Sequence, residues 1–237
     1  MPERLPSPFD PSRLPASADG SFSDSEALEA LLQPRISLFW GTQAPARPLL
    51  TAATTIAAGG LPVRLFDGGN SFDGYFVARL ARQLALASAH PPAHRASHPG
   101  EDPGGDRAAH TDPLRDAKRD PYDTLDRMHL SRAFTCFQLA ELIENAPAEP
   151  EPLFVLDLLA TFYDESVPLR DSERLLATTL THLRRLAAAG PVIVGGREPQ
   201  SLVKERWLLL DQLQAAADAA WMLRPPPAEA VLQPRLF

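Results

Sequence analysis

Residues 153–160 read LFVLDLLA, the most apolar segment of the chain. A short, continuous apolar run of this kind is typical of a strand that is buried on both faces of a parallel sheet. Two further segments, ISLFW at 36–40 and PVIVGG at 191–196, are also predicted strands. We therefore expect a buried sheet at the centre of the fold.

Amphipathic helices are predicted between these strands. Phe76, Leu80 and Leu84 share one face of a helix over 71–87, and Thr135 is a predicted N-cap of a helix over 135–147. Further strands are predicted at 61–69, 125–134 and 219–224, and further helices at 23–33, 45–60, 170–190 and 201–219. Strand and helix alternate, which favours right-handed crossovers between parallel strands. The expected fold class is α/β, a three-layer sandwich with a mostly parallel central sheet.

The distribution of proline indicates where the core begins and ends. The 237 residues suffice for one domain with a substantial core. The 25 prolines cluster at both ends and in one internal stretch, so they mark linkers. We expect a disordered N-terminal arm at 1–25, a core domain at 26–225 with a disordered insertion at 88–124, and a Pro-rich tail at 226–237.

The charge balance narrows the classes of partner. A formal net charge of −7 argues against gripping nucleic acid by overall charge, because phosphate contacts need concentrated Lys and Arg. A local basic loop stays open. The single Cys136 cannot form an internal disulfide, and the start MPERLPSPFD lacks the apolar segment of a signal peptide. No apolar run approaches the roughly 20 residues of a membrane helix. We therefore expect a cytoplasmic protein without membrane contact.

Five segments in order resemble the core of RecA/RadA-type recombinases. They are ISLFWGTQAPARPLL from Ile36, LFDGGNSFDGYF from Leu65, SRAFTCFQL from Ser131, LFVLDLLATFYDESV from Leu153 and LRRLAAAGPVIVGGREP from Leu183. In that family a strand leads into a phosphate-binding loop and a helix, and a later apolar strand ends in an Asp associated with magnesium. The resemblance spans 36 to about 200 and implies a RecA-like fold more strongly than a function.

The turn after the first strand departs from a working phosphate-binding loop, which reads G-x-x-x-x-G-K-[ST]. Gly41 matches, but Ala46, Arg47 and Pro48 stand at the positions of the second Gly, the Lys and the hydroxyl residue. Pro48 offers neither an N–H to phosphate nor an oxygen to a metal, and Arg47 is not a compact ammonium. The reading that we favour is a plain strand-to-helix turn with proline in the first helical turn.

The resemblance implies a vestigial nucleotide site at Gly41, Thr42, Arg47 and Asp157. Asp157 matches the magnesium-associated Asp, whereas Gly69 stands where the family has its catalytic Glu and cannot polarise water. We therefore expect no catalytic residue and no cofactor. The alternative hypothesis is a divergent DNA-dependent ATPase that uses Arg47 and Asp157 with ATP and magnesium.

The leading hypothesis is a non-catalytic RecA-like accessory protein in DNA recombination or repair. It would act by protein–protein interaction, with a recombinase or a repair polymerase as partner. Arg197, Lys204 and Arg206 belong to a local concentration of basic residues and are the candidates for contact with single-stranded DNA; a solvated helix face is the competing reading. Homo-oligomerisation stays open, and so does a regulator unrelated to DNA that reuses the fold.

Two other features carry weaker predictions. His90, His94 and His98 recur every four residues, but the prolines around them exclude a regular helix, so we expect no metal site. Cys136 starts a predicted helix and is expected to be a small buried hydrophobe rather than a nucleophile.

Overall fold

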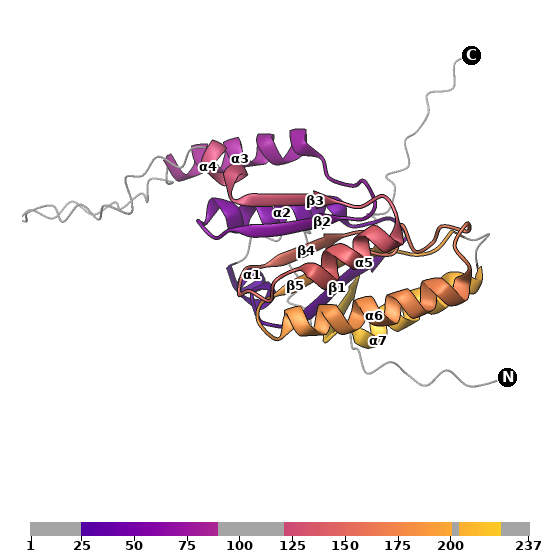
Figure 1. Cartoon of the computed structure of the whole chain (residues 1–237). Helices are drawn as coiled ribbons and strands as arrows, with labels where there is room; N and C mark the ends of the chain where they lie inside the picture. Colours follow the sequence, from indigo (N-terminus) through magenta and orange to yellow (C-terminus); the bar gives the residue numbers. More distant parts are fainter. Residues whose placement is uncertain (1–24, 90–120, 201–203, 224–237) are drawn as a thin grey trace, which may run out of the picture.

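The computed structural model describes residues 25–89, 121–200 and 204–223, which form one sheet with helices on both faces (Figure 1). The sheet has six strands in the order β3-β2-β4-β5-β1-β6, and every pair of neighbours is parallel. The strands are β1 (Ile36–Gly41), β2 (Val63–Asp67), β3 (Met128–Arg132), β4 (Leu153–Leu156), β5 (Val192–Arg197) and β6 (Ala219–Met222). The predicted α/β class with a mostly parallel central sheet is confirmed, and among the described residues the sheet is wholly parallel.

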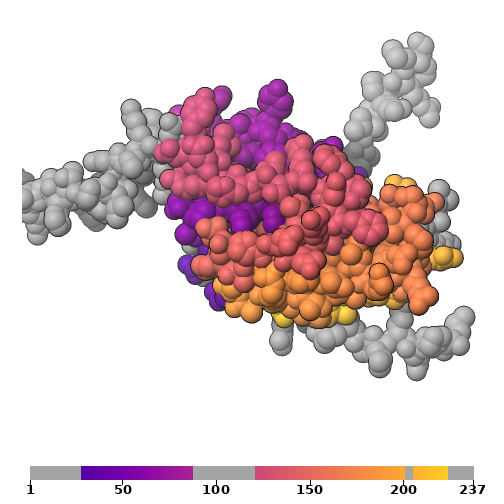
Figure 2. Space-filling view, in the orientation of Figure 1, coloured from indigo at the N-terminus to yellow at the C-terminus, as the bar shows by residue number. Residues whose placement is uncertain are grey.

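The order of the strands decides which face each helix covers. From β1 to β3 the chain moves toward one edge, and from β3 to β6 it moves back, so right-handed crossovers put the connecting helices on opposite faces. α2, α3 and α4 pack together on the first face, whereas α5, α6 and α7 pack in sequence on the second. The helices are α1 (Ser25–Leu31), α2 (Ala46–Ala58), α3 (Gly74–Ala89), α4 (Pro121–Asp126), α5 (Cys136–Asn145), α6 (Leu169–Ala187) and α7 (Trp207–Ala216). Figure 2 shows the second face, where α5 and α6 cover the sheet.

The core has two parts, one on each face of the sheet. Successive side chains of β4 alternate between them: Leu153 and Val155 face the layer of α5 to α7, while Phe154 and Leu156 face the layer of α2. All four are fully buried. A strand that is covered on both faces has no position for a polar side chain, which explains the continuous apolar run.

Most predicted helix boundaries lie within three residues of those observed, but the helix predicted over 201–219 is α7 at Trp207–Ala216, after a short 3-10 helix at Lys204–Arg206. Thr135 caps α5, and its side-chain oxygen accepts a hydrogen bond from the Gln138 N–H at 3.2 Å. α2 ends at Ala58, directly before Gly59 and Gly60, as its sequence predicts. The N-cap prediction and the glycine stop are both confirmed.

The insertion prediction is wrong at its C-terminal end. α4 spans Pro121–Asp126, so that residues 121–124 of the segment 88–124, which the sequence assigns to disorder, are helical, and residues 88 and 89 at its other end belong to α3. The reason is packing: Thr124 is buried, and Leu125 contacts the core on the face of α2. Residues 90–120, the arm up to residue 24 and the tail from 224 lie outside the described residues.

Candidate functional site

The carboxyl ends of four strands meet at one edge of the sheet and bring Gly41, Asp67, Asp157 and Arg197 to it. The helices that follow the neighbouring strands β1 and β5 leave to opposite faces, since α2 belongs to one layer and α7 to the other. In open α/β sheets, a crevice at such a switch point is the common position of a ligand site. This edge is therefore the candidate site.

Asp157 and Arg197 form an ion pair at the centre of this edge. Asp157 follows β4 directly, with a φ of 51° in the left-handed region, and its carboxyl is fully buried. Arg197 ends β5, and its Nε donates to Asp157 Oδ2 at 2.7 Å while its Nη2 contacts the same oxygen. Asp157 Oδ1 has no hydrogen-bond partner among the described residues. Burial raises the pKa of Asp157, and Arg197 opposes that rise.

Backbone and ring groups enclose the pair. The Tyr163 hydroxyl donates to the Arg197 carbonyl at 2.9 Å, and burial raises the pKa of Tyr163, to which the charge of Asp157 also contributes. Gly69 packs directly against the Asp157 carboxyl, so that a Cβ at this position would lie 2.6 Å from Oδ2. The sequence comparison put Gly69 where a catalytic Glu is expected. The packing shows that a side chain at position 69 requires Asp157 to move.

A second ion pair, Asp67 with Arg132, occurs at the ends of β2 and β3. Asp67 is fully buried and accepts hydrogen bonds from the N–H groups of Ser71 and Phe72 at 2.8 and 3.0 Å, which closes the turn after β2. Arg132 Nε lies 3.8 Å from Asp67 Oδ2, and its guanidinium stands over the Phe72 ring at 5.8 Å. Asp67 is thus satisfied by backbone groups, whereas Asp157 depends on Arg197.

The turn that resembles a phosphate-binding loop connects β1 to α2. Gly41 is buried because the Leu223 carbonyl at the end of β6 occupies the space of a Cβ. Thr42 is exposed. α2 begins at Ala46, so that Arg47 lies in its first turn; the Arg47 side chain is 71% exposed and lies 4.0 Å from Asp73 of the segment before α3. Its guanidinium also stands 5.3 Å above the ring of Phe76.

The residues predicted for nucleotide binding thus reach the same edge but are not joined into one site. Arg47 is paired with Asp73, and Asp157 is paired with Arg197. Gly41 has a packing role beside β6. The preferred reading, a strand-to-helix turn with Pro48 in the first helical turn, agrees with this geometry.

The predicted DNA contacts separate into three cases. Arg197 is only 37% exposed and is bound to Asp157. Arg206 is buried, with its guanidinium donating to the carbonyls of Phe162 and Val167 at 2.6 and 2.7 Å. We correct the prediction for Arg206 to a structural role, because its donors hold the loop before α6. The Lys204 side chain lies outside what the structure describes.

No local sequence pattern indicates that Arg206 is buried or that Arg197 is paired. Arg197 binds Asp157, which is 40 residues away at the end of the neighbouring strand. Arg206 binds the Phe162 carbonyl, which is 44 residues away in the loop between β4 and α6. The one available signal was positional: Asp157 and Arg197 follow two apolar strands directly, and the carboxyl ends of parallel strands share an edge.

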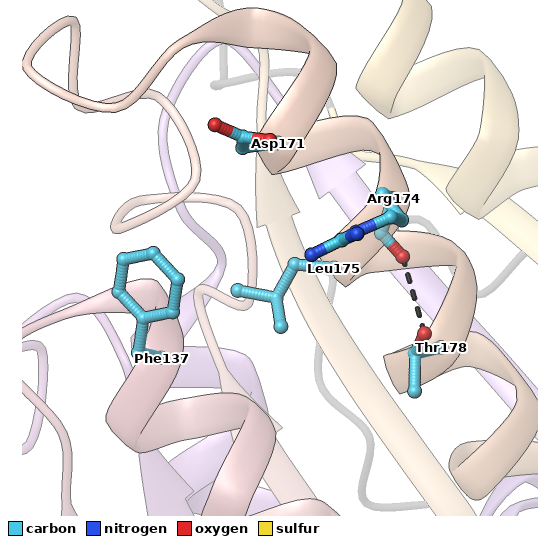
Figure 3. A pocket seen from close by; sticks show the side chains of 5 residues that line it. All are labelled: Phe137, Asp171, Arg174, Leu175 and Thr178. Atoms are coloured by element: carbon cyan, nitrogen blue, oxygen red, sulfur yellow. Dashed lines mark hydrogen bonds between the residues drawn. The ribbon is translucent and has the colours of Figure 1, made fainter.

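A surface pocket of about 450 Å³ lies between α5 and α6, on the second face (Figure 3). Leu175 points from α6 toward the ring of Phe137, and Asp171 and Arg174 stand at the rim. The Thr178 hydroxyl donates to the Arg174 carbonyl at 3.2 Å. No side chain of this lining pairs a nucleophile with a base, so the pocket offers no catalytic arrangement.

The remaining candidates are Cys136 and the three histidines. Cys136 is 1% exposed and free, and burial raises its pKa, as expected for a small buried hydrophobe. The described residues contain no cluster of three or more side chains that could bind a metal, and His90, His94 and His98 lie outside them. No helix in the described ranges is both long and apolar enough to cross a membrane.

The ion pairs at the carboxyl edge of the sheet determine which ligands this edge can bind. Three of its carboxylates, Asp67, Asp73 and Asp157, have an arginine within 4.0 Å, whereas Glu198, whose N–H donates to the Gly41 carbonyl at 2.9 Å, forms no ion pair with the described residues. A triphosphate with its metal needs cations and carboxylate oxygens that are free to bind it, whereas Asp157 Oδ2 and the Arg197 guanidinium are bound to each other. In comparisons with known proteins, the chain matches no protein-family model and no curated sequence.

Proposed function

We propose that this chain is a non-catalytic RecA-like accessory protein in DNA recombination or repair, which acts through protein and DNA contacts rather than through ATP turnover. The observation that carries the proposal is the buried pair of Asp157 and Arg197. The carboxylate that a magnesium ion would need is bound to a guanidinium that belongs to the chain itself. The link to DNA rests on the resemblance of the five segments to recombinase cores.

The turn between β1 and α2, which resembles a phosphate-binding loop, supports the same conclusion. A phosphate-binding loop uses several backbone N–H groups, an ammonium and a hydroxyl that holds the metal. Pro48 provides neither a backbone N–H for a phosphate nor a hydroxyl for the metal, and Arg47, at the position of the ammonium, contacts Asp73 and Phe76. The alternative, a divergent ATPase that uses Arg47 and Asp157, would have to break both pairs before it could bind a nucleotide.

Thermal unfolding with and without ATP and magnesium tests the proposal. A ligand at about 100 times its dissociation constant stabilises the native state by about 2.7 kcal/mol. For a domain of this size, that raises the melting temperature by roughly 5–10 °C. We expect no shift up to millimolar ATP, with an active RecA-type recombinase as the positive control.

A turnover assay with single-stranded DNA completes the test. We expect no ATP hydrolysis above background, and we expect a complex with a purified recombinase or repair polymerase in sedimentation experiments. DNA-stimulated hydrolysis that disappears in the Asp157→Ala variant would overturn the proposal, because it would show that Asp157 takes part in ATP hydrolysis as a ligand of the metal.

A further inference from the structure

The exposed face of α3 carries positive charge that the rest of the fold does not use. α3 contains Arg79 and Arg82 and no acidic residue, in a chain whose net charge is −7. Both arginines are exposed, and neither forms an ion pair with any part of the chain that the structure describes. By contrast, each of the arginines at the carboxyl edge of the sheet has a carboxylate within 4.0 Å; they are Arg47, Arg132 and Arg197.

The exposed residues of α3 form a single line. Tyr75, Arg79, Arg82 and Leu86 are spaced by four, three and four residues, which places them along one side of the helix. Tyr75 is 93% exposed and Leu86 is 61% exposed, while Val77 on the opposite side is fully buried. α3 packs against α2 and α4 and lies at the outside of its layer (Figure 1), so this line faces away from the core.

A third cation stands near the start of this line. Arg47, from the first turn of α2, lies above the ring of Phe76, the residue after Tyr75. Its partner Asp73 is 4.0 Å away, and 71% of the Arg47 side chain is exposed. The beginning of α3 therefore combines the exposed ring of Tyr75 with Arg79, one turn further along the helix, and with Arg47 over the neighbouring ring of Phe76.

Like charges three residues apart destabilise a helix, so Arg79 and Arg82 cost stability while they lack a partner. An anion bound across them would remove this repulsion. A ring that is exposed beside arginines is the arrangement by which proteins bind single strands, where an unpaired base stacks on the ring and cations contact the phosphates.

We propose that the face of Tyr75, Arg79 and Arg82 binds single-stranded nucleic acid. Tyr75 stacks on an unpaired base, and the two arginines contact neighbouring phosphates. The inference deepens the proposed function, on which its link to DNA rests, and it moves the nucleic-acid contact from Arg197 and Arg206 to the other layer of the fold.

Fluorescence anisotropy with a labelled thymidine oligonucleotide of about 15 nucleotides tests this site. Each phosphate contact to a single strand contributes about 0.7 to the slope of log K against log salt, so Arg79→Ala with Arg82→Ala should reduce that slope by about 1.4. Tyr75→Ala should weaken binding about tenfold, and Tyr75→Phe should retain it, because a phenyl ring stacks equally well.

The matched control is Arg170→Ala with Arg174→Ala, two exposed arginines of α6 on the opposite layer. This control should bind like the native chain, and melting temperatures should show that all variants fold. Four results would overturn the inference: no binding by the native chain at low salt, an unchanged salt slope in the α3 variant, an equal loss in the control, or α3 variants that bind the oligonucleotide normally and lose only a protein complex. None of these results bears on ATP turnover or on a protein complex, so those two parts of the proposed function can be tested separately from this site.

Discussion

Replacing Arg197 with Ala tests whether the pair at the end of β4 holds the fold in place. The change leaves the fully buried carboxyl of Asp157 without the one side-chain partner that it has among the described residues. Removal of one partner of a buried pair costs about 3–5 kcal/mol. Because 37% of the Arg197 side chain is exposed, we expect the lower end, about 3 kcal/mol. At an m-value of about 2 kcal/mol/M, the urea midpoint falls by about 1.5 M.

The dependence on pH separates this cause from a simple loss of packing. The pKa of Asp157 is raised in the folded protein, so its contribution to stability is complete below the ordinary value of 3.8 and is lost as pH rises through the folded-state pKa. Arg197 is the group that lowers this pKa. Without Arg197, the pKa of Asp157 rises further, and the stability that Asp157 contributes is lost over a range that extends to higher pH. The destabilisation by Arg197→Ala should therefore be smaller at about pH 5 than at about pH 8.

Arg132→Ala is the matched control for this experiment, since Arg132 also ends a strand beside a buried Asp. Asp67 keeps its two backbone donors in that variant, and Arg132 is 41% exposed, so the loss should stay below about 1 kcal/mol. Urea denaturation of both variants gives the comparison. Equal losses in the two, or a loss for Arg197→Ala that does not change with pH, would refute the reasoning.

Three further substitutions test other contacts. Gly69→Ala places a Cβ 2.6 Å from the Asp157 carboxyl and should cost about 1–3 kcal/mol in urea denaturation; a variant as stable as the native chain would contradict the close approach. Thr135→Ala removes the cap of α5 and should cost about 1 kcal/mol, with Thr135→Ser as the control that keeps the oxygen. Arg206→Lys cannot reproduce the planar donors that reach two carbonyls, so its thermal unfolding should show a loss of at least about 1.5 kcal/mol; an unchanged melting temperature would argue against the structural role.

Local sequence sufficed to predict the layers of this fold because each element carries its own signal. β4 is continuous in apolar residues, α5 has a Thr cap, and α2 runs into two glycines. These patterns depend on neighbours within a few residues. α4 was missed because PYDTLD has one strongly apolar residue, and what holds it is contact with α2 and α3.

The pairing at the candidate site could be predicted only in part. That Asp157 ends an apolar strand is visible in the sequence, but its partner is 40 residues away on the neighbouring strand. Strand order decides that pairing, and local patterns do not encode strand order. Arg206 shows the converse: it was grouped with surface charges, although burial and three hydrogen bonds make it part of the interior.

The position of β1 sets an order for folding during synthesis. Of the strands that the structure describes, β1 is made first, yet its two neighbours in the sheet are β5 and β6, which leave the ribosome last. Its apolar residues therefore wait for more than 150 residues of chain before they are covered, since β5 begins at Val192. Such long-range pairing makes folding slow and exposes newly made chains to aggregation. A nascent chain that is released before β5 cannot complete this sheet, so the domain should become protease-resistant in one late step.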